Sequence, residues 1–130
     1  MSKTINLVYV VRVDKIKMRW ILRSKIHKAR VIKADVNYAG SITIDKELME
    51  KVGLREREKV LVVSNTTGIR LETYVIEGKR GSGMIGMNGA AALLIRKGEE
   101  IIIMGFELTD KLIKVKNILV DQKNKFIKYL

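Results

Sequence analysis

The sequence predicts a mainly β fold, either a compact β-barrel or an α+β domain. Two observations lead to this prediction. The chain of 130 residues contains several short segments rich in Val and Ile, and only two short helical patterns interrupt them. The length suits one domain with a core of its own, and no proline, linker or repeat divides it.

Five segments are predicted to be strands, because each is short and rich in Val and Ile. In the fourth of them the side chains alternate, so Arg70 and Tyr74 lie side by side on one face and Thr73 lies on the other. The five segments are residues 29–36, 41–44, 60–64, 69–76 and 101–106.

Two short helices are predicted between the strands. Asp45 can cap the first, which ends at Gly53 because glycine readily adopts the left-handed conformation of a C-cap. Asn88 can cap the second, over residues 89–96, and Gly98 terminates it.

The two ends of the chain are less regular. Residues 1–17 are an N-terminal extension that we interpret as an added strand or a poorly ordered arm, and Met18 is an alternative translation start. A secretory signal is not predicted, because Arg12 and Asp14 interrupt the short apolar stretch and no cleavage site follows. The tail, residues 111–130, is mixed and basic and indicates no particular element.

The composition excludes several classes of protein. Without cysteine there is no disulfide framework, thiol nucleophile or thiolate metal site. His27 is the one histidine, which excludes a metal centre built from several histidines, so no metal is expected. No apolar run approaches the roughly 18–20 residues of a membrane span, so no membrane is expected as a partner.

The net charge of +12, from 26 Lys or Arg against 14 Asp or Glu, suggests nucleic acid as one partner. A Lys-rich surface, as found in heat-adapted proteins, explains the same charge. Aromatic residues make up only 5% of the chain, and the basic residues are dispersed rather than clustered. A basic β-barrel module that binds nucleic acid or an acidic partner therefore stays as the alternative function.

One glycine pattern imitates a nucleotide site. The segment 81–86, GSGMIG, matches the dinucleotide-binding pattern and follows a predicted strand. That fingerprint requires a helix that opens directly on the glycines, within a βαβ unit, and neither is present here. We therefore expect a tight glycine loop and no nucleotide cofactor.

Two short segments carry residues suited to chemistry. In a strand, Lys25 and His27 would face the same side, although the spacing alone favours an exposed edge with no special role. Gly40 and Ser41 form either an ordinary turn or a self-processing bond. Glycine leaves its carbonyl open and permits strained backbone angles, and the adjacent hydroxyl can attack that carbonyl in an N-to-O acyl shift.

Three motifs together resemble one known family. They are KIHKARVIKADVNYAGSITID, RLETYVIEGKRGSG and MNGAAA, in this order. The chain resembles the pyruvoyl-dependent aspartate 1-decarboxylases from about residue 18 to about residue 106. The resemblance implies a six-stranded double-psi β-barrel with short helices, in a domain of residues 18–130, and a cytoplasmic homotetramer.

The resemblance also implies an autocatalytic cleavage. Ser41 would attack the carbonyl of Gly40, and the chain would separate into residues 1–40 and 41–130. Ser41 would become a covalent pyruvoyl group, with Thr73 polarising the Gly40 carbonyl and Asn88 beside it. This lyase would form a Schiff base with L-aspartate and release carbon dioxide and β-alanine for pantothenate and coenzyme A. Whether a maturation factor is needed stays open.

The remaining roles follow from the same match. Lys25 and Arg70 would bind substrate carboxylates, Tyr74 would donate the proton, and His27 would line the site. The match thus reverses the interpretation of His27 as an exposed edge residue with no special role. The other substrate-binding residues that the match implies are Thr73, Asn88, Gly89, Ala90 and Ala91.

The chain departs from the family pattern at three positions. Asn37 stands where histidine is frequent, Ala39 where an acidic residue is frequent, and Val63 where some members have an aromatic residue. The first two bring local details of the cleavage into question. None of the three removes a residue that the chemistry needs.

Overall fold

The computed structural model describes residues 17–130, and the expected N-terminal strand or arm falls almost wholly outside them. The prediction of a mainly β fold is confirmed. The strands are β1 (Arg19–Arg30), β2 (Lys33–Asp35), β3 (Ser41–Asp45), β4 (Lys59–Ser64), β5 (Arg70–Gly78), β6 (Ile85–Asn88), β7 (Glu100–Thr109), β8 (Lys116–Val120) and β9 (Phe126–Tyr129), and the helices are α2 (Lys46–Val52) and α3 (Ala91–Leu94).

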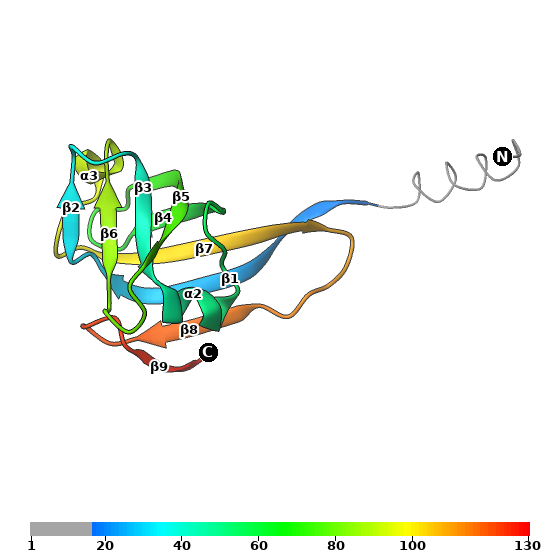
Figure 1. Cartoon of the computed structure of the whole chain (residues 1–130). Helices are drawn as coiled ribbons and strands as arrows, with labels where there is room; N and C mark the ends of the chain where they lie inside the picture. The colour runs from blue at the N-terminus through cyan, green and yellow to red at the C-terminus, as the bar shows by residue number, and fades with distance from the viewer. Residues whose placement is uncertain (1–16) are drawn as a thin grey trace, which may run out of the picture.

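One bent sheet contains all of these strands, in the order β2-β6-β3-β5-β4-β7-β1-β8-β9. Figure 1 shows β2, β6 and β3 standing across β7, β1 and β8, so the sheet folds over onto itself. Residues 17–130 form nine strands, and two of these, β8 and β9, lie in residues 116–129, where the sequence indicated no element.

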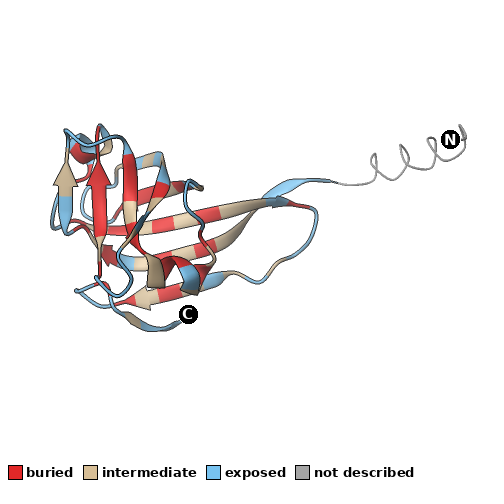
Figure 2. Cartoon of the chain, in the orientation of Figure 1, coloured by how far each residue is buried: buried red, intermediate tan, exposed pale blue. Residues whose placement is uncertain are grey.

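The core lies inside the bend. Ile26, Ile42, Val62 and Ile103 are fully buried and come from four different strands. Figure 2 shows that buried positions recur along the long strands and are separated by less buried ones. Burial of a side chain of this size contributes roughly 1.5–3 kcal/mol to the stability of the fold, so the sheet is stabilised by this shared core.

Helix α2 follows the prediction closely. The Asp45 carboxylate accepts a hydrogen bond from the Glu47 amide at 2.9 Å, which caps the helix. Gly53 ends it in the left-handed conformation, with φ of 77°. Leu48, Met49 and Val52 bury the inner side of the helix.

Two predicted elements are wrong in part. The strand expected over 29–36 is broken, because the chain turns after Arg30 and starts again at Lys33 as β2. The helix expected over 89–96 covers only Ala91–Leu94, and Ala90 precedes it without a side-chain cap. The other four strands and the first helix are confirmed within a few residues. In residues 17–130, no helix has the length and apolar character to cross a membrane.

Candidate active site

The Gly40–Ser41 bond lies where an exposed turn enters the sheet. Gly40 is exposed, whereas Ser41 is the first residue of β3 and is fully buried. Strand β3 runs antiparallel to β6, which places Ser41 opposite Asn88. The serine hydroxyl is therefore held inside the protein while the preceding carbonyl stays at the surface edge.

Asn88 is the polar neighbour of the Ser41 hydroxyl. Its side-chain amide donates to Ser41 Oγ at 2.8 Å and to Thr43 Oγ1 at 2.9 Å. The contact from Ser41 Oγ to the Ala39 carbonyl is long, at 3.5 Å. Asn88 does not cap a helix, contrary to the prediction, because it is the last residue of β6 and α3 begins only at Ala91, with Ala90 at its N-cap.

Thr43 is a site residue that the sequence analysis missed. It lies two residues after Ser41 in β3, so both side chains point to the same side of the strand. The alternation of side chains in residues 41–45 already placed Thr43 on the same face as Ser41. That Thr43 belongs to the site follows only from the position of Asn88, which contacts both side chains.

Gly89 packs directly against Gly40. Its φ is +70°, and a Cβ at this position would lie 2.7 Å from the Cα and 2.8 Å from the amide nitrogen of Gly40. Gly40 itself has no such requirement: its φ is not in the left-handed region, and a Cβ would meet nothing within 4 Å. The positive φ, which favours glycine, is thus at Gly89 and not at Gly40.

Tyr74 and Arg70 share the outer face of β5, as the alternation predicted. Both are exposed, and Tyr74 retains 40% of its accessible surface. The parallel register pairs Ile42 with Val75, so the preceding residues, Ser41 and Tyr74, lie next to each other on the outer side. Thr73 is half-buried on the other side, and in the described residues it makes no hydrogen bond to Gly40 or Ser41.

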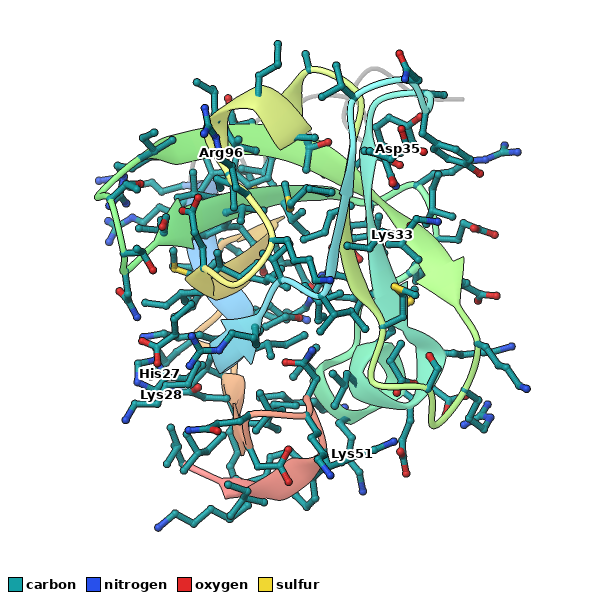
Figure 3. All side chains as sticks on the ribbon, turned by 90° about the vertical axis from the view of Figure 1, so that its left-hand side faces the viewer. His27, Lys28, Lys33, Asp35, Lys51 and Arg96 are labelled. Carbon is teal, nitrogen blue, oxygen red and sulfur yellow. The ribbon has the colours of Figure 1, made fainter. Side chains whose placement is uncertain are left out.

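Lys25 and His27 lie on β1 and flank the fully buried Ile26, so both point outward as predicted. Strands β5, β4 and β7 separate β1 from β3. This is a separation of roughly 19 Å along the sheet, at ~4.8 Å per strand. Figure 3 shows His27 on the opposite side of the molecule from Asp35, which pairs with Asn88. One chain therefore does not bring Lys25 or His27 to Ser41.

Two polar atoms beside Lys25 lack partners in the described chain. Asn117 in β8 lies next to Lys25 in the parallel register, on the same side of the sheet. Its Oδ1 and the Nδ1 of His27 are buried without a hydrogen bond. An unpaired buried polar atom costs about 1–3 kcal/mol, so these two atoms destabilise this part of the sheet in the single chain.

The glycine-rich segment has a structural role. The buried Asp45 carboxylate accepts hydrogen bonds from the Gly81 amide at 2.9 Å and the Gly83 amide at 2.8 Å. A Cβ on Gly83 would lie 2.4 Å from the Lys123 carbonyl oxygen. The amides that a nucleotide phosphate requires are thus bound to a carboxylate, and the tight glycine loop is confirmed.

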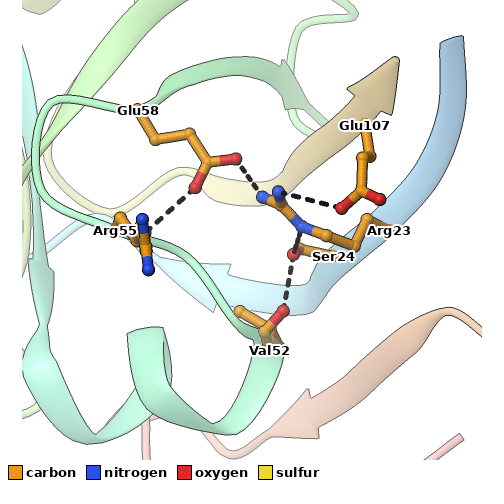
Figure 4. A network of polar contacts seen from close by, with 6 residues as sticks. All are labelled: Arg23, Ser24, Val52, Arg55, Glu58 and Glu107. Atoms are coloured by element: carbon orange, nitrogen blue, oxygen red, sulfur yellow. Dashed lines mark hydrogen bonds and ion pairs between the residues drawn. The ribbon is translucent and has the colours of Figure 1, made fainter. Parts of the chain in front are cut away.

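A hollow lies on the outer face of the sheet, over β4 and β5, and its lining residue Lys59 pairs with Tyr74. Its volume is about 490 Å³, and it is lined by Trp20, Glu58, Lys59, Val60, Leu61, Glu72 and Phe106. Figure 4 shows the polar network beneath its edge, where Glu58 binds the Arg23 guanidinium and accepts from the Arg55 amide at 3.0 Å. Both carboxylates in the lining are ion-paired, Glu58 with Arg23 and Glu72 with Lys59 at 3.0 Å.

Clearly shifted pKa values occur at the surface, away from Ser41. The hydrogen bond from Arg80 lowers the pKa of Glu50, and the same bond raises the pKa of Arg80. Backbone hydrogen bonds from Lys125 and Lys123 lower the pKa of Asp121. Within residues 17–130 no group of acidic and histidine side chains is placed to hold a metal ion.

The chain is a small, mainly β protein in which a buried serine, Ser41, stands where an exposed turn enters the sheet. A family model described as aspartate decarboxylase matches residues 17–127. The chain belongs to the aspartate decarboxylase family. The bent, mainly β sheet agrees with the double-psi β-barrel expected for this family.

Curated relatives support the assignment. A protein of Acetivibrio thermocellus named aspartate 1-decarboxylase is 51% identical over 111 residues, covering 82% of this chain and 88% of the relative. One of Caldicellulosiruptor saccharolyticus with the same name is 52% identical over 112 residues, covering 83% and 88%. One of Thermotoga petrophila, also so named, is 50% identical over 106 residues, covering 82% and 93%.

Proposed function

We propose that this protein is an aspartate 1-decarboxylase that converts L-aspartate to β-alanine and carbon dioxide, using a pyruvoyl group made from Ser41. The observation that carries the proposal is the hydrogen bond of 2.8 Å from Asn88 to the buried Ser41 hydroxyl at the Gly40–Ser41 bond. The relatives named aspartate 1-decarboxylase specify the reaction and its substrate.

The self-processing is proposed in three balanced steps. Ser41 Oγ attacks the Gly40 carbonyl carbon, the C–N bond breaks, and the hydroxyl proton passes to the Ser41 nitrogen, which leaves an ester. Loss of the Ser41 α-proton then breaks the ester C–O bond and releases the Gly40 carboxylate. Water replaces the nitrogen of the resulting dehydroalanine and ammonia departs, which leaves a pyruvoyl group at the start of the fragment 41–130.

The surroundings of Ser41 fit such a group. Asn88 is nearly buried, with 5% exposure, and its amide donates to Ser41 Oγ, the atom that would attack Gly40. When present, the pyruvoyl group supplies the electron-withdrawing carbonyl that this decarboxylation needs. Asn88 would donate a hydrogen bond to it, as it does to the hydroxyl before cleavage.

The substrate-binding roles follow the outer face of the sheet. Tyr74 lies next to Ser41 on the neighbouring strand, and its phenol is the proposed proton donor to the α-carbon. Arg70 lies on the same face of β5 and would bind a substrate carboxylate through its guanidinium. Thr73 is proposed to polarise the Gly40 carbonyl during cleavage, and Ala90 and Ala91, which follow Gly89, would form the wall of the site.

We propose further that a second copy of the chain completes the site, in a homotetramer. Lys25 and His27 face outward and lie several strands from Ser41, so they would serve the Ser41 of a neighbouring protomer. Exposed apolar residues on the arm formed by β1 and β7 favour such an assembly, since Trp20 is 70% exposed beside Leu108. A maturation factor and the cytoplasmic location stay predictions.

The deciding experiment is intact mass spectrometry of the purified protein, together with an assay for β-alanine. Cleavage after Gly40 should give two fragments, and the larger one should lack the mass of one ammonia relative to a free Ser41 terminus. The Ser41→Ala variant should stay intact and inactive. A wild-type chain that stays whole after prolonged warming, or that binds nucleic acid in a salt-sensitive way without decarboxylating aspartate, would contradict the proposal and favour the binding module.

A further inference from the structure

We propose that Thr43 is a positioning residue for the self-cleavage: it holds the Asn88 amide in the orientation that directs one of its hydrogens to Ser41 Oγ. The inference rests on the proposed function, because it concerns the same bond. It adds a residue that the family resemblance did not supply, and it follows from the side-chain contacts around Asn88.

Both hydrogens of the Asn88 side-chain amide are used in hydrogen bonds. The amide of Asn88 donates to Ser41 Oγ at 2.8 Å and to Thr43 Oγ1 at 2.9 Å. An asparagine side-chain nitrogen carries two hydrogens, so both are taken. Two acceptors on one strand determine the plane of the amide, whereas a single acceptor would leave it free to turn about its terminal torsion.

The Thr43 side chain is itself confined by the neighbouring strands. Thr43 is opposite Gly86 in the antiparallel register, and a Cβ on Gly86 would lie 3.7 Å from Thr43 Cβ. On the other side, a Cβ on Gly78 would lie only 3.1 Å from the Thr43 methyl group. Two neighbouring strands thus leave room for a β-branched side chain, whose χ1 angle is stiff. The Thr43 hydroxyl is therefore held toward Asn88.

The atom proposed to react is Ser41 Oγ, and Asn88 is its main hydrogen-bond partner. Apart from Asn88, the contact of Ser41 Oγ in the described residues is the long one of 3.5 Å to the Ala39 carbonyl. A hydroxyl without a firm partner populates several rotamers, of which only one suits attack on Gly40. The Asn88 hydrogen bond selects one rotamer, and Thr43 fixes the bond that selects it. Thr43 thus contributes to the orientation that makes an intramolecular attack fast.

The test compares two substitutions at this position. Thr43→Val keeps the branched shape and removes the hydroxyl, while Thr43→Ser keeps the hydroxyl and removes the methyl group. Cleavage is followed from the moment of synthesis in a cell-free translation, by the appearance of fragments 1–40 and 41–130. We expect Thr43→Val to slow cleavage roughly three- to tenfold, as the loss of one hydrogen bond implies, and Thr43→Ser to stay near the wild-type rate.

A matched control separates this effect from general loss of a buried threonine. Thr109 is buried, and its hydroxyl accepts a hydrogen bond from the Lys111 amide at 3.1 Å, far from Ser41 along the sheet. Thr109→Val should leave the cleavage rate unchanged. Activity per cleaved chain should fall much less than the cleavage rate in Thr43→Val, which a merely unstable protein would not show.

Several results would overturn the inference. Wild-type cleavage in Thr43→Val would do so, and so would equal slowing in Thr43→Ser, because the hydroxyl would then be irrelevant. If Thr43→Val does not fold, Thr43→Ala takes its place: slow cleavage there beside normal cleavage in Thr43→Ser supports the inference, and equal rates overturn it. Failure of the wild-type chain to cleave would instead contradict the proposed function itself.

Discussion

Replacing Gly89 with alanine should damage the cleavage reaction more than it damages the fold. Gly89 has φ of +70°, a conformation that costs an alanine about 1–2 kcal/mol. The added Cβ would also lie 2.7 Å from Gly40 Cα, well inside the usual contact distance of about 3.5–4.0 Å. The Gly40–Ser41 segment must therefore move by about 1 Å. A displacement of this size costs roughly a hundredfold in rate at a reacting centre.

A control at Gly53 isolates the collision from the backbone strain. Gly53 has φ of 77°, but a Cβ there would meet nothing within 4 Å. In urea denaturation, Gly53→Ala should lose about 1–2 kcal/mol from the free energy of unfolding and still cleave normally. Gly89→Ala should lose more, with about 1–3 kcal/mol of overpacking added, and should cleave very slowly. Equal cleavage rates in the two variants would refute the reasoning.

Three further predictions concern the proton donor, a buried clamp and acid stability. Tyr74→Phe should cleave normally yet lose roughly a hundredfold or more in decarboxylation, and normal turnover would reject Tyr74 as the donor. Asn124→Ala should lower the free energy of unfolding by about 3–5 kcal/mol in urea denaturation. The buried Asn124 side chain accepts a hydrogen bond from the Arg30 amide at 2.7 Å and donates to the carbonyls of Arg30 and Gly83. A loss under about 1 kcal/mol would contradict this prediction. Because the pKa of Asp121 is lowered from 3.8, its stabilising contribution is present above that pH and is lost as the pH falls below it. Urea titrations near neutral pH and below pH 3.8 should thus show that wild type is more stable than Asp121→Asn only near neutral pH. A difference in the free energy of unfolding that does not change with pH would contradict the stabilising role of the Asp121 carboxylate.

The parts of the fold that the sequence predicted are those in which local and tertiary preferences agree. Asp45 and Gly53 delimit helix α2 as expected, because capping and left-handed glycine are local properties. The alternation in β5 correctly placed Arg70 and Tyr74 on one face, since a half-buried strand has a period of two. The same reasoning placed Lys25 and His27 on one side of β1.

The parts that it missed depend on contacts distant in sequence. The break after Arg30 coincides with two hydrogen bonds between the Arg30 backbone and the side chain of Asn124, 94 residues away. Strands β8 and β9 carry lysines on their outer positions, which obscured the apolar alternation of Ile118 and Val120. In the same way, the spacing of Lys25 and His27 showed a shared face but not their distance from Ser41, which the order of the strands determines.

The error at Asn88 is the most informative of these, because two roles competed for the same amide. By local rules an asparagine before Gly89 is a good helix cap, since its side-chain oxygen can accept from the following amides. Here it ends β6 instead, and its nitrogen donates to Ser41 and Thr43 across the sheet. The helix that follows is consequently short and starts without a side-chain cap. A helix cap is worth about 1 kcal/mol, and two hydrogen bonds across the sheet, at about 0.5–1.5 kcal/mol each, are worth as much or more. The contact that is distant in sequence therefore prevails over the local preference of Asn88.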